Sequence, residues 1–235
     1  MIKGKKMKHV MTGNKGFTLI ELMITLVISS IIMAGIYAIY NAQATARRNQ
    51  KIVVDMMQNL RAGIYFMERE IRVAGFDPMQ TANAGITIAN LSDIQFTLDD
   101  NQDGDLALGA GIDPGESIRY MLSNDANGDG IADAGGSSTL QRIDGVNAAV
   151  DIATNIEALQ FFYFDNNSAQ TTNLNAITTV QIAMVARGES GETGYTNTRP
   201  YNVTLINGAT VQVLAPQGDN IRREMLTTAV RCRNL

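Results

Sequence analysis

Hydrophobic residues follow two different patterns in the first third of the chain. Residues 17–40 are apolar almost throughout and contain one charged side chain, that of Glu21. Further along, apolar side chains recur at alternating intervals of four and three residues, which places them on one face of a helix. These residues are Val53, Met57, Leu60, Ile64, Met67, Ile71 and Ala74. Because no proline precedes Pro78 and Gly75 is a suitable helix stop, we predict a single helix over residues 17–74.

The apolar face of residues 53–74 has two interpretations. A face of this kind usually packs on the protein's own domain, but it also suits a coiled coil with another chain. The two interpretations are compatible, because a long helix has one face for its own sheet and others for its neighbours. Glu68 and Arg72 lie four residues apart in the favourable order, which predicts an ion pair along this helix.

Beyond Pro78 the apolar pattern changes to the period of two that is typical of strands. The segments expected to be strands are residues 94–98, 118–122, 156–165, 177–187, 201–206, 209–214 and 225–233. Asn207-Gly208 stands between two of these segments and predicts a hairpin. Polar residues 166–176 and 188–199 indicate loops. We therefore predict an α+β fold in which a long N-terminal helix packs on an antiparallel β-sheet.

Composition excludes several classes of function. The chain has 235 residues and a net charge of −4, and five of its 19 Lys and Arg lie in residues 1–16. Without that segment, 14 Lys and Arg face 23 Asp and Glu, and the resulting net charge of −9 disfavours nucleic-acid binding. The one histidine, His9, lies in the same segment. A chain cut after residue 16 therefore lacks Ser-His and Cys-His catalysis and His-ligated zinc, and we expect no enzyme.

Cys232 is the one cysteine of the chain, so no intramolecular disulfide is possible. Its first interpretation is a buried thiol in a C-terminal strand, and its second is a disulfide to another chain.

The apolar segment is long enough to cross a membrane. Its 24 residues, 17–40, exceed the roughly 20 that a helix needs to span a bilayer. A signal peptide would have a shorter apolar region and an Ala-x-Ala-like site after it. The preceding lysines are expected to stay in the cytoplasm, which places the C-terminal part of the chain on the other side of the membrane.

Glu21 is unfavourable in such a segment unless it has a partner. A carboxylate costs about 2.5–3.5 kcal/mol on insertion scales when it lies deep in a bilayer, and less near the interface. No Lys or Arg occurs between Lys15 and Arg47. A cut between Gly16 and Phe17 would create a positive amine that neutralises Glu21 of a neighbouring subunit in a low dielectric. The alternative is a glutamate that extends towards the membrane surface.

Residues 15–21 read Lys-Gly-Phe-Thr-Leu-Ile-Glu. This run resembles the prepilin cleavage and methylation motif of type IV pilins and of type II secretion pseudopilins. The resemblance implies that prepilin peptidase cleaves after Gly16, that Phe17 is N-methylated, and that Glu21 aligns incoming subunits. It divides the chain into a leader (residues 1–16), a transmembrane helix half (17–40), an amphipathic helix half (41–75) and a β-rich domain (76–235). Many major pilins have a helix-breaking proline where this chain has Ala38, so local melting of the helix is not carried over.

Residues 67–78 and 222–234 resemble the corresponding segments of PilW-type minor pilins. The resemblance implies a type IV pilin-like fold and a structural subunit that helps to initiate pilus assembly, in a tip complex with other minor pilins. The implied partners are prepilin peptidase, the other minor pilins, the major pilin, the inner-membrane assembly platform and a tip adhesin. The implied location is the inner membrane, with the domain in the periplasm, and then the extracellular pilus. The alternatives are a minor pseudopilin of type II secretion and a Ca²⁺-dependent adhesive or ligand-binding tip subunit.

Acidic residues are concentrated in residues 93–133, which contain ten Asp and Glu and one base, Arg119. Two loops in this region repeat the pattern Asp-x-Asn-x-Asp-Gly, 26 residues apart. Alternating oxygen ligands and a glycine at the sixth position are typical of Ca²⁺ loops. The second loop resembles the calcium loops of dockerins and thrombospondin type 3 repeats. Neither loop has the EF-hand glutamate at position twelve, where Ala110 and Gly136 stand.

We expect Ca²⁺ in at least the second loop, and the alternative is a turn that is merely solvated. The candidate ligands share short oxygen-bearing side chains at alternate positions. They are Asp99, Asn101, Asp103 and Asp105 in the first loop and Asp125, Asn127, Asp129 and Asp133 in the second.

Overall fold

The structure is a computed structural model that describes residues 16–108, 111–133, 136–145 and 147–235. The leader predicted at residues 1–16 therefore lies outside the described residues except for Gly16. Helix α1 spans Leu19–Ile71, close to the predicted residues 17–74. The chain divides into two compact units, Met1–Arg48 and Asn49–Leu235. The boundaries expected at residues 16, 40 and 75 concern processing and environment, and they remain predictions.

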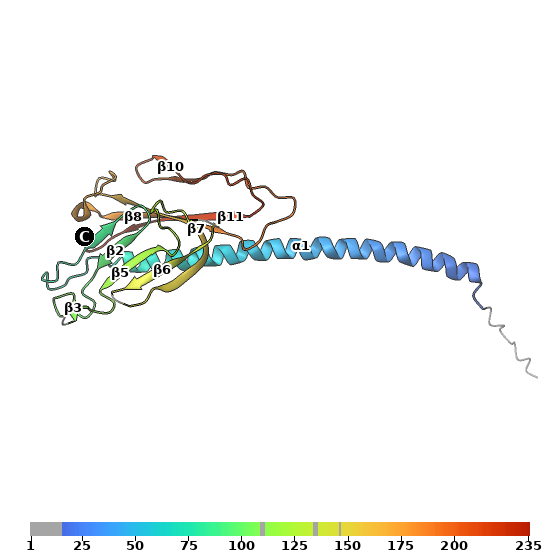
Figure 1. The fold of residues 1–235 in the computed structure, drawn as a ribbon, viewed down its shortest axis with the longest axis horizontal. Helices are drawn as coiled ribbons and strands as arrows, with labels where there is room; N and C mark the ends of the chain where they lie inside the picture. The colour runs from blue at the N-terminus through green and yellow to red at the C-terminus, as the bar shows by residue number, and fades with distance from the viewer. Residues whose placement is uncertain (1–15, 109–110, 134–135, 146) are drawn as a thin grey trace, which may run out of the picture. The chain divides into compact units, whose positions relative to one another are not determined.

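The second unit is built on one antiparallel sheet with the strand order β1-β2-β5-β6-β7-β8-β11 (Figure 1). The seven strands are β1 (Ile86–Ala89), β2 (Ile94–Thr97), β5 (Ser117–Leu122), β6 (Ser138–Asp144), β7 (Val150–Phe164), β8 (Thr179–Arg187) and β11 (Arg223–Arg231). Two pairs stand apart from this sheet, β3 (Ala107–Leu108) with β4 (Gly111–Ile112), and β9 (Tyr201–Thr204) with β10 (Thr210–Leu214). A short 3₁₀ turn, η1, spans Leu174–Ala176. The predicted α+β fold, a long helix packed on an antiparallel sheet, is confirmed.

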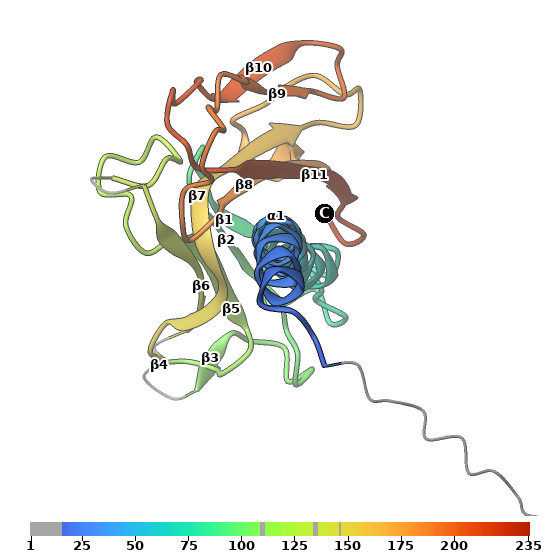
Figure 2. The same ribbon diagram turned by 90° about the vertical axis from the view of Figure 1, so that its right-hand side faces the viewer.

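The sheet curves around the C-terminal part of α1, as the view along the helix shows (Figure 2). Most of the predicted apolar face is buried there, namely Leu60, Ile64, Met67, Ile71 and Ala74, while Val53 and Met57 are half-buried. The face therefore packs on the protein's own sheet, which confirms the first interpretation of the pattern. Met56 and Gly63 are buried as well and were not predicted.

Gly63 marks the closest approach of α1 to the sheet. A Cβ added at this position would lie 2.9 Å from both Leu140 Cδ2 of β6 and Met184 Cε of β8. It would also lie 3.4 Å from the Cβ of Ala153 in β7. The missing side chain therefore lets the helix backbone settle against three strands.

Polar contacts fix the last turn of α1 on the sheet. The carboxylate of Glu70 accepts a hydrogen bond from the hydroxyl of Tyr120 in β5. Its Oε2 also lies 3.0 Å from Nε of Arg142 in β6. Burial, followed by the bond to Glu70, raises the pKa of Tyr120, so the phenol remains a donor. The predicted pair of Glu68 and Arg72 is also present.

The helix ends where the C-terminal segment crosses it. Gly75 has a φ of 77°, and an added Cβ would collide with the side chain of Leu235. The amide of Arg233 donates to the carbonyl oxygen of Arg72 at 3.1 Å. Glycine is needed here because other residues rarely adopt this backbone conformation and because the space is filled. The two segments that carry the PilW resemblance, 67–78 and 222–234, thus lie in contact.

Strand β8 and the part of β7 from Ile156 onward are buried on both faces, which explains their nearly continuous apolar sequence. Phe161 and Tyr163 belong to the core shared with α1, whereas Phe162 and Phe164 belong to a second core. The second core is closed by β9 and β10, which pair antiparallel on either side of the predicted Asn207-Gly208 turn. The predicted hairpin is therefore confirmed. Strands β1 and β6 were not predicted, because neither has more than two large apolar residues in alternation.

A buried thiol and a buried guanidinium lie at the two ends of β11. Cys232 directly follows β11 and is 4% exposed, and burial raises the pKa of its thiol to about 11. This finding agrees with the buried-thiol interpretation. At the other end of β11, the guanidinium of Arg223 is buried between the carboxylates of Glu157 and Asp219. A buried charge is tolerated here because it is fully paired.

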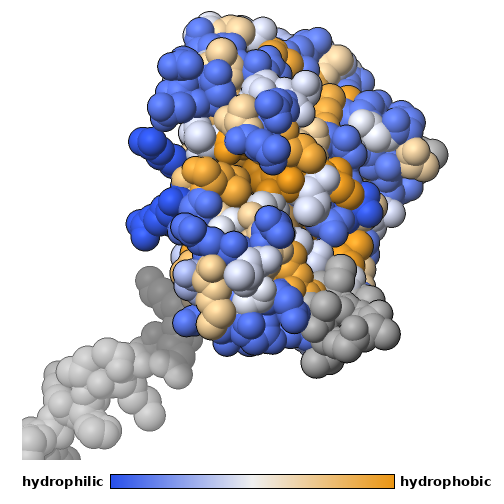
Figure 3. Space-filling model, turned by 90° about the vertical axis from the view of Figure 1, so that its left-hand side faces the viewer, coloured by the Kyte–Doolittle hydropathy of each residue, from blue (hydrophilic) through white to orange (hydrophobic). Residues whose placement is uncertain are grey.

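One face of the second unit is mostly hydrophilic. On the face shown in Figure 3, hydrophilic residues surround a smaller apolar area. The large exposed apolar side chains of this unit include the isolated residues Leu91, Val150 and Ile206 and the adjacent pair Tyr65 and Phe66, whose rings contact edge to face. Isolated side chains of this kind are normal for a folded domain in water.

We predict that Gly63→Leu destabilises the domain by about 1–3 kcal/mol, because the new side chain overpacks the contact between α1 and the sheet. A loss of this size lowers Tm by roughly 2–12 °C. Thermal unfolding of the full chain in detergent, followed by circular dichroism, measures the change. The matched control is Ala62→Leu, at an exposed position next to Gly63, with an effect within about 0.5 kcal/mol. Equal stability of the two variants would contradict the close packing.

Candidate functional site

The predicted cleavage point lies immediately before α1. Gly16 and Phe17 have extended or irregular backbone and are exposed, and the Phe17 side chain is 89% exposed. A Cβ added at Gly16 would meet no atom within 4 Å. The described part of the chain therefore leaves the bond between Gly16 and Phe17 accessible.

Glu21 has a local partner that sequence reasoning missed. Its Oε2 accepts hydrogen bonds from the backbone amide and from the hydroxyl of Thr18, each at 2.9 Å. In return, the amide of Glu21 donates to Oγ1 of Thr18 at 3.3 Å. This reciprocal arrangement is a capping box, in which an N-cap Thr and a Glu three residues later satisfy amides at the start of the helix. The Thr-x-x-Glu spacing was visible in the sequence and was a sufficient signal.

The capping box satisfies one carboxylate oxygen without neutralising the charge. Both donors are neutral groups, so Glu21 keeps its negative charge at the start of the apolar segment. The positive end of the helix dipole favours an anion at this position. The arrangement therefore holds a charged carboxylate at a fixed place while leaving it able to pair with a cation.

The helix that follows Glu21 exposes apolar side chains all around. Every residue from Leu19 to Arg48 is exposed, and the large apolar ones from Leu19 to Tyr40 are at least half exposed. The helix is long and apolar enough to cross a membrane, with none of its most apolar window buried in the chain. A helix that is apolar on all sides requires lipid or other apolar helices around it.

The first acidic loop connects β2 to the strands that follow. Oδ2 of Asp99 accepts from the amide of Gly104 at 3.2 Å, and Oδ1 of Asn101 accepts from the amide of Asp103 at 2.8 Å. The amide of Asp105 donates to Oδ1 of Asp103 at 3.1 Å. Gly104 has a φ of 88°, as expected for the sixth position of such a loop. The Asp105 side chain itself is exposed.

The second acidic loop has the same hydrogen bonds at the same positions. Oδ2 of Asp125 accepts from Gly130, Oδ1 of Asn127 accepts from Asp129, and Oδ1 of Asp129 accepts from Ile131. Asp133 turns back and accepts from the amide of Ala126 at 2.7 Å. The repeat seen in the sequence is thus also a repeat of backbone geometry.

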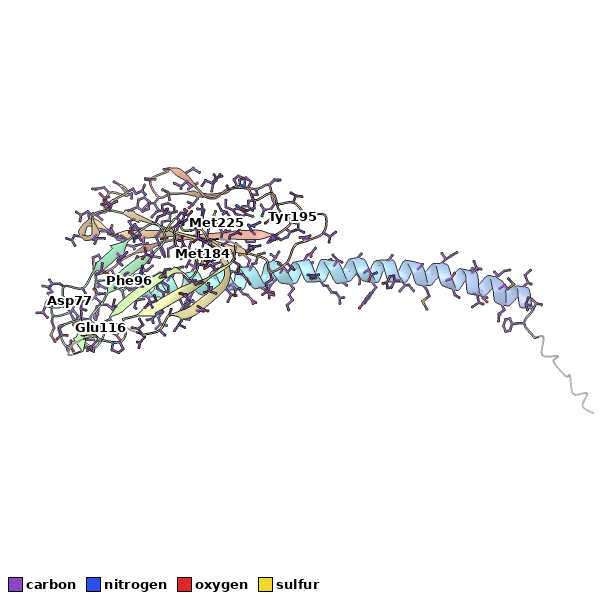
Figure 4. All side chains as sticks on the ribbon, in the orientation of Figure 1. Asp77, Phe96, Glu116, Met184, Tyr195 and Met225 are labelled. Atoms are coloured by element: carbon purple, nitrogen blue, oxygen red, sulfur yellow. The ribbon has the colours of Figure 1, made fainter. Side chains whose placement is uncertain are left out.

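The two loops differ in what surrounds them. The second loop is bonded mostly to its own amides, whereas the first is joined by two acids that sequence reasoning left out of the ligand set, Asp113 and Glu116. Oδ2 of Asp113 accepts from Nδ2 of Asn101 at 2.7 Å, and Oε1 of Glu116 accepts from the Asn101 amide at 3.4 Å. Figure 4 labels Glu116 at the same end of the domain as Asp77, which follows α1. Spacing gave no signal for these two acids, because they approach the loop only once β2 and β5 pair.

The described carboxylates do not converge on a common point that could hold a metal ion. Among residues 16–108, 111–133, 136–145 and 147–235, no group of three or more His, Cys, Asp or Glu is arranged to hold an ion. Calcium binding at the predicted ligands therefore stays a prediction.

Two segments of the chain match known protein families. Residues 11–37 match the family described as the prokaryotic N-terminal methylation motif. Residues 119–234 match the family described as Type IV Pilus-assembly protein W. This second match covers nearly half of the chain and makes it similar to the PilW family there. The matched segment runs from β5 to the C-terminal residues that contact Arg72.

One solved structure similar to this chain is that of a type IV-like pilin from Thermus thermophilus. The two share 12% sequence identity with a TM-score of 0.46, and the match covers 76% of this chain and 97% of that one. A comparison with curated proteins finds no match.

We predict that Thr18→Val loosens the start of α1, because valine keeps the shape of threonine but lacks the capping oxygen. Loss of a cap of about 1 kcal/mol speeds hydrogen exchange of the Glu21 amide roughly fivefold. Exchange measured by NMR on the full chain in micelles tests this prediction, with Thr18→Ser as the matched control that keeps the oxygen. Similar exchange in the two variants would show that the capping box does not form.

Proposed function

We propose that this chain is a minor pilin that helps to initiate type IV pilus assembly. Cleavage after Gly16 by prepilin peptidase and N-methylation of Phe17 prepare the subunit. It then leaves the inner membrane and enters a fibre through its N-terminal helix. The observation that carries the proposal is the single carboxylate, Glu21, held at the start of an exposed apolar helix in a chain that matches the PilW family.

The proposed assembly step is an exchange of partners at Glu21. Before assembly, the hydrogen bonds from Thr18 offset part of the cost of keeping a carboxylate in an apolar environment. During assembly, the amine that cleavage creates on Phe17 of a neighbouring subunit takes their place. A charge pair in a low dielectric is stronger than two bonds to neutral donors, so the exchange favours the assembled state. Because the pair forms at one register only, it also aligns the subunits.

We infer the partners from the resemblance of the chain to the two matched families. They are prepilin peptidase, other minor pilins, the major pilin, the inner-membrane assembly platform and a tip adhesin. We place the domain in the periplasm before assembly, because the basic residues that precede the apolar segment favour the cytoplasm. After assembly we place it in the extracellular pilus, in a tip complex.

Two other functions compete with this proposal. A minor pseudopilin of type II secretion would carry the same N-terminal motif, and the PilW match argues for the pilus instead. A Ca²⁺-dependent adhesive or ligand-binding tip subunit would use the acidic loops of residues 99–133, and this role is compatible with a pilus subunit. The PilW family is structural, and we propose no enzymatic activity.

We predict that Glu21→Gln reduces entry of the subunit into filaments at least tenfold, because glutamine cannot pair with the Phe17 amine. A tenfold loss corresponds to about 1.4 kcal/mol. The variant is expressed in a strain that lacks the gene. Pili are then counted, and the subunit is quantified in sheared filaments by mass spectrometry.

The matched control for this experiment is Thr25→Val, in the next turn of the same helix, where the hydroxyl donates to the backbone carbonyl oxygen of Leu22. This control should restore piliation fully. Both variants should begin at Phe17, which shows that processing is intact. Normal piliation in the strain without the gene, or normal entry of Glu21→Gln subunits, would contradict the proposed function.

A further inference from the structure

Three buried carboxylates lie in or beside the first acidic loop. Asp99 and Glu116 are 0% exposed and Asp113 is 6% exposed. Each uses one oxygen to accept a hydrogen bond, from Gly104, from the Asn101 amide and from the Asn101 side chain respectively. The other oxygen of each, Oδ1 of Asp99, Oδ1 of Asp113 and Oε2 of Glu116, is buried without a hydrogen-bond partner among the described residues.

A buried carboxylate oxygen without a hydrogen-bond partner is unfavourable, and three such oxygens beside one loop indicate a missing partner. The nearby bases are engaged elsewhere, since Arg119 pairs with Asp93 and Arg142 pairs with Glu70 and Asp144. The side chain of Asn101 is bonded to Asp103 and Asp113, and its backbone amide to Glu116, so these three carboxylates lie near one another. Like charges that lie close together repel one another, and a cation between them would offset that repulsion.

The side chain of Asn101 bridges two carboxylates of this region. Its Nδ2 donates to Oδ2 of Asp103 at 2.9 Å and to Oδ2 of Asp113 at 2.7 Å, so one amide group bridges two carboxylates. A turn of this side chain would replace the amide nitrogen with the amide oxygen. The cluster would then present oxygens alone, which are the ligands that Ca²⁺ prefers.

We propose that the first acidic loop is a Ca²⁺ site whose ligands are Asp99, Asn101, Asp103, Asp113 and Glu116. Asp113 and Glu116 supply the charge that the missing EF-hand glutamate would have supplied. In the present arrangement these side chains do not converge on one point. Binding therefore requires them to rotate towards the ion. Ca²⁺ fits better than Mg²⁺, because flexible loops of many carboxylates suit its larger and more variable coordination.

The second acidic loop lacks the feature that carries this inference. Both oxygens of Asp125 accept from backbone amides of the loop, and its carboxylates contribute no unpartnered buried oxygen among the described residues. The structure thus shifts the stronger candidate from the second loop, which sequence reasoning favoured, to the first.

Binding at the first loop would stabilise the junction between the helix and the sheet. The amide of Asp99 donates to the carbonyl oxygen of Phe76 at 2.7 Å, just beyond the end of α1. The hydroxyl of Thr81 donates to the carbonyl oxygen of Gly104 at 2.6 Å. An ion that orders this loop would therefore also order the segment that leaves the helix. This inference concerns the folded domain and does not depend on pilus assembly.

The test is a titration of the full chain in detergent with CaCl₂, followed by equilibrium dialysis and by thermal unfolding, with MgCl₂ as the ion control. We expect Ca²⁺ to bind with a dissociation constant of about 10⁻⁴–10⁻³ M. At ~10 mM Ca²⁺ we expect Tm to rise by several degrees, and Mg²⁺ to have a smaller effect. Absence of binding and of any shift at this concentration would overturn the proposal.

The deciding variant is Asp113→Asn with Glu116→Gln, which keeps the shape of both side chains and removes their charge. Without Ca²⁺ its Tm should equal or exceed that of the native chain, because the repulsion is relieved, and its Ca²⁺ response should be lost. The matched control is Asp125→Asn with Asp129→Asn in the second loop, which should keep the first-loop response. If the double variant fails to fold, Glu116→Gln alone is used, with an affinity at least about tenfold weaker. A native response in the first-loop variants, or its loss only in the second-loop control, would overturn the proposal.

Discussion

The structure depends on a charged carboxylate at the start of a helix that is apolar on all sides. Glu21 cannot share that segment with lipid or other apolar helices unless donors or a cation approach it. Thr18 supplies two donors and fixes the carboxylate where the helix dipole also favours it. The proposed assembly step uses this position, because a subunit that carries a new positive terminus offers a better partner than a hydroxyl and an amide.

The sheet and the C-terminal segment pack on the C-terminal part of the same helix. The sheet curves around residues 56–74, Gly63 allows the backbone to settle on three strands, and Glu70 is clasped by Tyr120 and Arg142. The C-terminal residues then cover the helix end at Arg72 and Gly75. One helix therefore has its apolar side chains exposed before residue 41 and largely buried in its own domain after residue 55, so each part suits a different environment.

Much of this fold was accessible from local sequence signals, and the rest was not. The helix stop at Gly75, the buried face and the Asn207-Gly208 hairpin each have a short-range cause. Strands β1 and β6 could not be predicted from the sequence, because their burial comes from neighbouring strands rather than from alternation of their own residues. At the site, Thr18 was readable from its spacing to Glu21. Asp113 and Glu116 were not, because pairing of β2 with β5 brings them to a loop more than ten residues away.

The central claim is that Glu21 of this chain contacts the N-terminal amine of a neighbouring subunit in the filament. A zero-length carbodiimide coupling on purified filaments, followed by mass spectrometry, measures that contact directly, because it joins a carboxylate only to an amine that already touches it. The account predicts an amide bond between Glu21 and the first residue of another subunit. Filaments that contain the chain and yield coupled products at other carboxylates, but none at Glu21, would contradict it.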